Sequence, residues 1–242
     1  MIIRDLSNSF ILKEIKESTV AIIPVGSIEQ HGPHLPVSTD SDIISYIAKK
    51  VTERTGFLLL PTVEYGVSFE HYPFFNMSVS SSTLEKVLTD LCLSLWKNKI
   101  TNIIILNGHH GNLKTIKKIP DRVSRISGFK AKVFVYSYWY FMKRKMDHAG
   151  FVETSIMLAI SNKVEMDKAI KGLISDNMPK KKLDKISKLA NKSFISATKN
   201  GIWGDPTNAS AKVGRAILKE IITSIVRESQ TCLTGQTRKL HQ

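Results

Sequence analysis

The sequence predicts an α/β fold in which βαβ units build a mostly parallel central sheet. Four short apolar runs alternate with segments of helical periodicity, and this alternation is typical of parallel strands joined by crossover helices. The strands are expected at residues 20–25, 57–63, 102–106 and 132–138. A chain of 242 residues can form one α/β domain with a large buried core, so we expect a single domain over residues 1–242.

Apolar periodicity predicts helices at residues 42–54, 83–97, 112–126, 153–161 and 209–227. The second of these has Ser82 as its expected N-cap, with Glu85 at the third helical position of a capping box. Pro120 lacks an N–H and clashes with the preceding turn, so it should kink or divide the third helix.

The composition is that of a soluble globular protein, with 42% hydrophobic and 23% charged residues. No apolar run approaches the ~20 residues that a bilayer span requires. Charges interleave with apolar residues near the N-terminus, which therefore lacks the apolar core of a secretory signal, and we expect a cytoplasmic protein. Cys92 and Cys232 have no ligand spacing, so both are expected to be structural.

The net charge of +14 raises the alternative of a nucleic-acid-binding protein. The basic residues are scattered, and the densest cluster, residues 180–182, lies in a Lys-rich region at 162–200 without interleaved aromatic residues. This pattern favours a solvated surface over a nucleic-acid site. A basic surface is compatible with an anionic small-molecule substrate.

Unusual polar residues follow all four predicted strands. The segments are GSIEQHGPHLPVSTD, EYGVSFEHYP, NGHHGN and, shortly after the fourth strand, DHAGFVETS. The carboxyl ends of parallel strands meet at one edge of an open α/β sheet, which is where such folds bind ligands. These distant segments are therefore expected to converge on one crevice.

In the first segment, Glu29 and His31 are two residues apart, so an extended backbone would point both side chains the same way. Asp40 follows after a stretch that glycine and prolines stiffen. The alternatives are a turn with surface polar groups and, for Asp40, a helix N-cap. The whole pattern favours a metal site.

NGHHGN ends an apolar strand, so His109 and His110 should emerge where the chain leaves the core. Its two glycines let backbone approach a ligand closely. Asn107 and Asn112 are expected to orient ligands or to satisfy backbone groups of the tight turn.

In DHAGFVETS, Glu153 either interacts only with a helix N-terminus or ligates a metal, and the other motifs at the same edge favour the ligand. Mixed histidine and carboxylate ligands suit Zn²⁺, Mn²⁺ or Fe²⁺. Such an ion lowers the pKa of a bound water to about 7 and polarises a carbonyl, the two needs of amide hydrolysis.

These motifs, together with GIWGDPTNAS at residues 201–210, resemble the creatininase family over nearly the whole chain. The resemblance implies a three-layer α/β/α sandwich, often assembled as a hexamer, with a site for two divalent ions. It implies that Glu29, Asp40 and His109 hold one ion. His31, a bridging Asp40 and a further carboxylate would hold the other.

The chain departs from the creatinine-hydrolysing members of that family at Gly111, where those carry a liganding Glu. Glu153 is the motif carboxylate left to replace it. His110 stands where those enzymes have a substrate-contacting Tyr, and residues 76–77 replace a common Pro–Gly. NGHHGN looks more like the branch of formylaminopyrimidine deformylases and mycofactocin-maturation peptidases.

We therefore predict a metal-dependent amidohydrolase that acts on a formamide or cyclic amide of a small molecule. His148 is either its proton shuttle or a structural histidine, and Ser68, His71 and His110 either contact the substrate or are loop residues. The alternatives are a metallopeptidase that trims a short peptide, a creatinine amidohydrolase, and a non-catalytic anion- or nucleic-acid-binding protein on an old enzyme fold.

Overall fold

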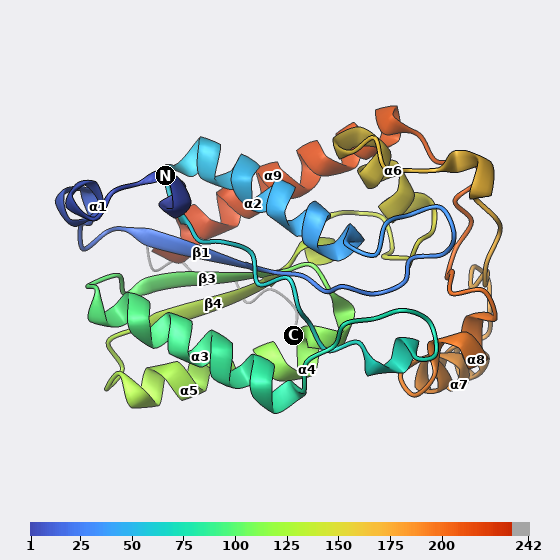
Figure 1. Cartoon of the computed structure of the whole chain (residues 1–242), viewed down its shortest axis with the longest axis horizontal. Coiled ribbons are helices and arrows are strands. Elements are labelled where there is room, and N and C mark those ends of the chain that lie inside the picture. The colour runs from blue at the N-terminus through green and yellow to red at the C-terminus, as the bar shows by residue number, and fades with distance from the viewer. Residues whose placement is uncertain (234–242) are drawn as a thin grey trace.

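The computed structural model, which describes residues 1–233, places one sheet of four parallel strands between two layers of helices (Figure 1). The strands are β1 (Val20–Val25), β2 (Leu58–Leu59), β3 (Asn102–Asn107) and β4 (Lys132–Ser137), in the order β2-β1-β3-β4. The α-helices are α1 (Asn8–Glu14), α2 (Thr39–Thr55), α3 (Ser81–Lys97), α4 (Leu113–Ile116), α5 (Ile119–Ile126), α6 (Phe151–Ile160), α7 (Lys180–Ala190), α8 (Phe194–Thr198) and α9 (Ala211–Leu233). Short 3-10 helices are η1 (Ile3–Asp5), η2 (Phe69–His71), η3 (His110–Asn112), η4 (Tyr138–Phe141) and η5 (Met166–Lys168). The predicted α/β/α sandwich is confirmed.

Each face of the sheet has its own apolar core because strand side chains alternate between the two faces. In β1, Val20 and Ile22 pack under α2, α6 and α9, whereas Ala21, Ile23 and Val25 pack against α3, α4 and α5 (Figure 1). Burial on both faces explains why β1 and β3 are continuous apolar runs in the sequence.

The strand order places a topological switch point between β1 and β3. From β1 the chain crosses to β2 at one edge of the sheet, and from β3 it crosses to β4 at the other. Parallel crossovers are right-handed, so opposite directions put the connecting helices on opposite faces. The loops after β1 and β3 therefore diverge, and the crevice between them is the place where such folds bind ligands.

The second strand is shorter than predicted. Residues 57–63 were expected to be extended throughout, yet regular pairing ends at Leu59. The N–H groups of Leu60 and Val63 donate to the carbonyls of Ile22 and Pro24, so this segment advances three residues while β1 advances two, and the regular ladder is interrupted. The prediction of a strand over 57–63 is wrong in extent for this reason.

Two helix predictions have different outcomes. The N-cap of α3 is Ser80, whose Oγ accepts from the Thr83 N–H at 3.1 Å, so the assignment to Ser82 is wrong because the helix begins earlier. Residues 112–126 are divided into α4 and α5, as the proline predicted. Pro120 lies in the first turn of α5, where its missing N–H costs no helical bond.

Cys92 is fully buried in α3, and burial raises the pKa of its thiol to about 12, consistent with a structural cysteine. The side chain of Cys232 lies outside the described part of the chain. Across residues 1–233, no helix combines the length and apolar character of a membrane span. That residues 1–242 form one domain stays a prediction, because residues 234–242 are not described.

Candidate functional site

A cavity of about 440 Å³ lies at the carboxyl end of the sheet. All four polar segments contribute to it, as predicted: Glu29 and Asp40 after β1; Glu70 and His71 after β2; His109, His110 and Gly111 after β3; and Asp147, His148 and Glu153 after β4. Trp139, Tyr140, Met146, Ser187, Ala190, Asn191, Phe194 and Trp203 complete the lining. The crevice at the switch point is therefore a cavity walled by histidines, carboxylates and aromatic rings.

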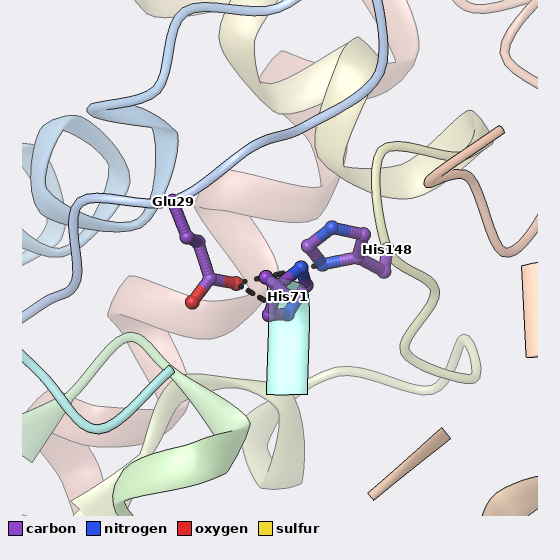
Figure 2. Close-up of side chains that lie close together, drawn as sticks. All are labelled: Glu29, His71 and His148. Carbon is purple, nitrogen blue, oxygen red and sulfur yellow. Dashed lines mark ion pairs between the residues drawn. The ribbon is translucent and has the colours of Figure 1, made fainter. Parts of the chain in front are cut away.

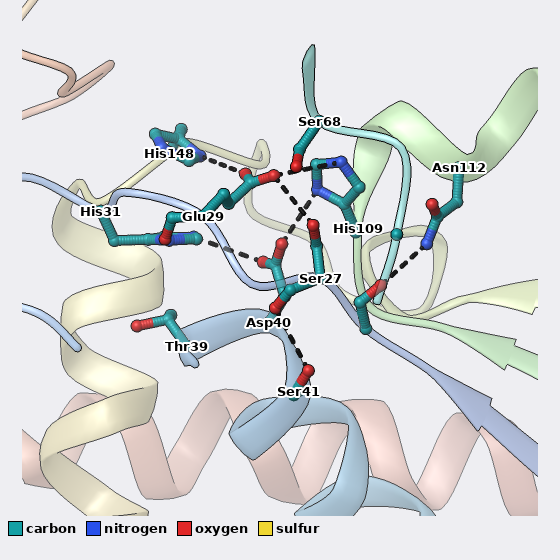
Figure 3. Close-up of polar contacts among 12 residues, drawn as sticks. Ser27, Glu29, His31, Thr39, Asp40, Ser41, Ser68, His109, Asn112 and His148 are labelled. Atoms are coloured by element: carbon teal, nitrogen blue, oxygen red, sulfur yellow. Dashed lines mark hydrogen bonds and ion pairs between the residues drawn. The ribbon is translucent and has the colours of Figure 1, made fainter. Parts of the chain in front are cut away.

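Glu29 and His31 reach the site from an extended segment that follows β1. Glu29 bridges Asn76 in antiparallel fashion, and its N–H donates to the Val37 carbonyl at 3.0 Å. The two side chains are fully buried and point into one cluster (Figure 3). The prediction that these two side chains, two residues apart, point the same way is confirmed.

Asp40 lies at the centre of this cluster (Figure 3). It belongs to the first turn of α2, whose N-cap is Ser38, so Asp40 is not the capping residue. His31 Nε2 lies 3.3 Å from Asp40 Oδ1, and His109 Nδ1 lies 2.9 Å from Asp40 Oδ2. One histidine therefore faces each oxygen of the carboxylate.

Backbone carbonyls fix which nitrogen of each of these histidines carries a proton. His31 Nδ1 lies 3.0 Å from the carbonyl oxygen of Glu29, two residues earlier, and His109 Nε2 lies 2.9 Å from the carbonyl oxygen of Val67. A carbonyl only accepts, so each of these nitrogens is a donor. Such an N–H···O=C bond is the usual outer support of a metal-binding histidine, and in the neutral rings that bind a metal the lone pairs are on His31 Nε2 and His109 Nδ1, the nitrogens closest to Asp40.

Asn107 and Asn112 hold the NGHHGN turn. Asn107 Nδ2 donates to His109 O at 2.8 Å, and its Oδ1 accepts from the His109 N–H at 3.2 Å. Asn112 joins two other loops, because its Oδ1 accepts from the Val67 N–H and its Nδ2 donates to Gly26 O. Asn107 thus satisfies backbone groups of the turn and orients His109, and Asn112 ties the turn to the loops after β1 and β2.

Glu153 lies in the first turn of α6 and turns inward. Its Oε2 accepts from the Ala149 N–H at 2.7 Å and lies 3.7 Å from His31 Nε2. The N–H groups that open α6 are capped by Asp147, which accepts from Val152 at 2.7 Å and Glu153 at 3.2 Å. Asp147 was not predicted as a site residue. Its carboxylate interacts with the positive N-terminal end of α6, so the Glu153 carboxylate is not needed there and lies in the cluster instead.

The cluster fits a divalent cation. Glu29 Oε1, His31 Nε2 and Asp40 Oδ2 are buried and make no hydrogen bond in the described part of the chain. Donor atoms of Glu29, His31 and Asp40 lie within 4.8 Å of one another, as do those of Glu29, His71 and His148, and those of His31, His148 and Glu153. Buried polar atoms without partners are costly, and an ion held by such oxygen and nitrogen donors removes that cost.

Charges in the cluster perturb one another strongly. Burial raises the pKa of Glu29 and of Glu153 to about 8 each. Burial opposes the charged form of His31 and His109, yet neighbouring carboxylates outweigh it and raise both pKa values to about 10. Burial also opposes ionisation of Asp40, but the two histidines hold its pKa well below its usual range. Without a cation, the cluster retains protons to balance its carboxylates.

Two further histidines that line the cavity, His71 and His148, lie close to Glu29 (Figure 2). His71 Nε2 lies 3.2 Å and His148 Nδ1 3.9 Å from Glu29 Oε1. Burial lowers the pKa of His71 to about 3 and that of His148 well below its usual value. Both rings are therefore uncharged at neutral pH, one able to donate and the other to accept a hydrogen bond.

The other predicted substrate residues differ in accessibility. His110 is exposed on the cavity wall, with its ring centroid 6.1 Å from that of Trp139. Ser68 is fully buried beside His109 (Figure 3) and is not among the lining residues. A contact between Ser68 and substrate stays a prediction.

Phe194, in the Lys-rich region, lines the cavity although no motif in the sequence marks it. Its ring stacks on His71 at 4.5 Å and meets the edge of His148 at 4.7 Å. The surrounding sequence, NKSFISATKN, reads as a surface segment, and only tertiary packing of α8 beside η2 brings it to the site. Part of the Lys-rich region thus closes the cavity.

Position 111 has no room for a side chain. A Cβ there would lie 2.2 Å from Val67 O, 2.4 Å from His109 Nε2 and 3.0 Å from Glu70 Oε1. Real Cβ contacts are not this short, so the turn and the segment after β2 would have to separate. The chain is built around a glycine here, and a carboxylate cannot be restored by simple substitution.

Gly111→Ala is accordingly expected to destabilise the protein by about 1–3 kcal/mol, the usual cost of overpacking, and to lower activity by moving His109. Urea unfolding measures the first effect. Gly128→Ala is the control for activity: a Cβ at position 128 meets nothing within 4 Å, so its φ of +62° adds backbone strain in the turn before β4 but no clash, and the variant should stay active. A Gly111→Ala protein as stable and active as the parent would show that the loops separate at no cost.

Sequence comparison identifies relatives over most of the chain. The creatininase family, described as creatinine amidohydrolase, matches residues 5–228. A mycofactocin precursor peptide peptidase of Mycolicibacterium smegmatis is 32% identical over 213 residues, 84% of this chain and 81% of that protein. A creatinine amidohydrolase of Pseudomonas putida is 30% identical over 178 residues, covering 62% and 68%. The 2-amino-5-formylamino-6-ribosylaminopyrimidin-4(3H)-one 5'-monophosphate deformylase of Methanothermus fervidus is 27% identical over 228 residues, covering 88% and 84%.

Solved structures agree with the fold. A mutant creatininase described as "Zn-Zn type" superposes with a TM-score of 0.81 at 24% identity, covering 93% of this chain and 95% of that one. This likeness shows the fold. The predicted resemblance and the predicted enzyme class are confirmed: the chain belongs to the creatininase family of amidohydrolases.

Proposed function

We propose that this protein is a metal-dependent hydrolase that cleaves the C–N bond of a formamide or ring amide in a small molecule. The observation that carries the proposal is the buried set of ligand atoms on Glu29, His31 and Asp40, which make no hydrogen bond in the described part of the chain and lie within 4.8 Å of one another at the base of the cavity that Glu29 and Asp40 line. Such a set is made for cations rather than for packing.

The distances favour two ions that share Asp40. Glu29, Asp40 and His109 would hold one ion: His109 Nδ1, the nitrogen that does not face Val67 O, lies 2.9 Å from Asp40 Oδ2, and donor atoms of Glu29 and Asp40 lie within 4.8 Å of one another. His31, Asp40 and Glu153 would hold the other, with His31 3.3 Å from Asp40 Oδ1 and 3.7 Å from Glu153 Oε2. Zn²⁺, Fe²⁺ and Mn²⁺ all suit these donors.

When bound, the ions would supply an acidified water and a polarised carbonyl. The chain supplies the rest. The Nδ1 atom of His148 faces Glu29 and can accept a proton from the water and pass it to the departing nitrogen. Trp139 and Phe194 wall the cavity and limit the water around the reacting atoms.

Activity on a formamide or ring amide is expected to exceed creatinine hydrolysis at least roughly tenfold in kcat/KM, about 1.4 kcal/mol of transition-state discrimination. The reason is that the cavity wall has Gly111 and His110 where creatinine-hydrolysing members are expected to have a liganding Glu and a substrate-contacting Tyr. A panel of formamides, lactams, creatinine and dipeptides, assayed with Zn²⁺, Fe²⁺ or Mn²⁺, measures this. Efficient creatinine turnover with no activity on formamides would contradict it.

The panel should include each formamide with and without a phosphate group. The net charge of +14 favours an anionic substrate, yet the described residues that line the cavity include no Lys or Arg. Attraction would therefore act at the rim, where the Lys-rich α7 contributes Ser187 and Ala190 to the wall. Preference for the phosphorylated compound, lost at high salt, is the expected result.

A second candidate is a metallopeptidase that trims a short peptide, because the M. smegmatis relative is a precursor peptide peptidase. The dipeptides of the same panel distinguish it. A homo-oligomer stays a prediction, and exposed apolar side chains in the segment before α3 offer a surface for it: Tyr65, Phe69, Tyr72, Phe75 and Met77.

A further inference from the structure

Gln30 lies between two of the proposed ligands and is nearly buried, with 7% of its surface exposed. Two backbone groups fix the orientation of its amide. The Gly32 N–H donates to Gln30 Oε1 at 3.0 Å, and Gln30 Nε2 donates to Gly201 O at 3.1 Å. A flipped amide would set N–H against N–H and oxygen against oxygen, so the assignment is unambiguous.

The remaining amide hydrogen determines the tautomer of His71. Gln30 Nε2 lies 2.9 Å from His71 Nδ1, which must accept because the amide nitrogen can only donate. Neutral His71 therefore carries its proton on Nε2. That protonated nitrogen lies 3.2 Å from Glu29 Oε1.

The same residue determines the tautomer of His148. His148 Nε2 lies 3.1 Å from both the Gln30 backbone oxygen and the Gln30 Nε2 atom. Both amide hydrogens are already used, so His148 Nε2 is the donor, and it donates to the Gln30 carbonyl. The lone pair on His148 Nδ1 is left facing Glu29 Oε1 at 3.9 Å.

We propose that Gln30 is a positioning residue that gives the two histidines opposite roles at one edge of the cavity, a donor on His71 and an acceptor on His148. The inference rests on the proposed hydrolysis and deepens it. Adding water across a C–N bond places OH on the carbonyl carbon and one proton on the departing nitrogen. An acceptor that later releases that proton is required, and the Gln30 carbonyl leaves Nδ1 of His148 free for it.

The segment after Gly201 now has a structural role. Gly201 has φ of +78°, and a Cβ there would lie 2.1 Å from Gln30 Oε1. Two residues on, Trp203 pairs its backbone with His148 in both directions, at 3.0 and 2.8 Å. The start of GIWGDPTNAS therefore holds both the Gln30 amide and the His148 ring in place.

The test is Gln30→Glu, which keeps the size of the side chain but replaces the amide donor by an acceptor. Nitrogen-15 NMR of the full-length protein, metal-free and zinc-loaded, should show the parent His71 and His148 as Nε2–H tautomers. In Gln30→Glu, Nδ1 of His71 should gain a proton. With zinc content unchanged, kcat should fall about 10–100-fold, the usual effect of losing an outer partner of a site, and KM should change little.

Gly201→Ala displaces the amide donor without supplying an acceptor, so the Nδ1–H form of His71 should appear beside the Nε2–H form. Gly56→Ala is the control, because Gly56 also has a positive φ, +74°, but a Cβ there meets nothing within 4 Å. Parent rings protonated on Nδ1, or Gln30→Glu with unchanged tautomers and kcat, would overturn the inference. If the parent is inactive on every amide tested, the proposed function fails, while the spectra still decide the role of Gln30.

Discussion

Asp40→Asn is expected to remove both bound metal and turnover, with kcat/KM lower by at least about 10³-fold, about 4 kcal/mol. The two oxygens of Asp40 face His31 at 3.3 Å and His109 at 2.9 Å, so loss of its charge weakens both proposed ion sites at once. Elemental analysis of protein purified without added metal, together with initial rates, measures the two effects.

Asp42→Asn is the matched control for this variant. Asp42 lies in the same first turn of α2 but accepts from Ser38 Oγ and pairs with Lys163, away from the cavity. It should retain metal and activity. An Asp40→Asn protein with full metal content and full activity would show that Asp40 bridges nothing.

The second large effect concerns pH: the metal-free protein should lose stability as pH rises from about 6 to about 9. Folding raises the pKa of Glu29 and Glu153 from 4.5 to about 8, and that of His31 and His109 from 6.5 to about 10. For raised pKa values, the stabilisation is complete below the unfolded value and is lost as pH climbs through the folded one. The window of loss therefore runs from pH 4.5 to 8 for the carboxylates and from 6.5 to 10 for the histidines.

The slope is about 1.4 kcal/mol per pH unit for each proton that the folded chain holds and the unfolded chain does not. Bound Zn²⁺ takes the place of these protons, so the rise in Tm on adding zinc should be larger at pH 8 than at pH 6. Differential scanning calorimetry at both values measures it. Glu153→Gln should flatten the metal-free slope, whereas Glu53→Gln on the surface should not. A zinc effect independent of pH would contradict the account.

The fold could be predicted well from the sequence because the apolar runs mark the strands and the polar motifs mark the ends of those strands. Apolar runs such as 20–25 and 102–106 are buried on both faces of a parallel sheet, and the polar motifs begin where these runs end. The strand order, unknown from sequence, then made those ends meet at a switch point. Two predictions were wrong in extent. The second strand loses its regular pairing with β1 after Leu59, and α3 begins before the predicted cap, with Ser80 as its N-cap.

The site was predicted only where residues share a motif. Glu29, His31 and Asp40 stand in one segment, and His109 stands in another whose glycines marked it as a binding turn. Phe194 comes from a Lys-rich segment without any such signal, so only packing reveals it. The hydrogen-bonding roles of Gln30 were also beyond the sequence, because its partners lie 41, 118 and 171 residues away.

A crystal structure of the zinc-loaded protein, with the ions located by anomalous scattering, tests the central claim most directly. The account predicts two ions that share Asp40, one also held by Glu29 and His109, the other by His31 and Glu153. Glu153 should lie about 2.0–2.2 Å from its ion, the usual zinc–carboxylate distance. Glu153 oxygens more than about 3 Å from every ion would contradict the assignment and show that the carboxylate missing at Gly111 is replaced by another residue.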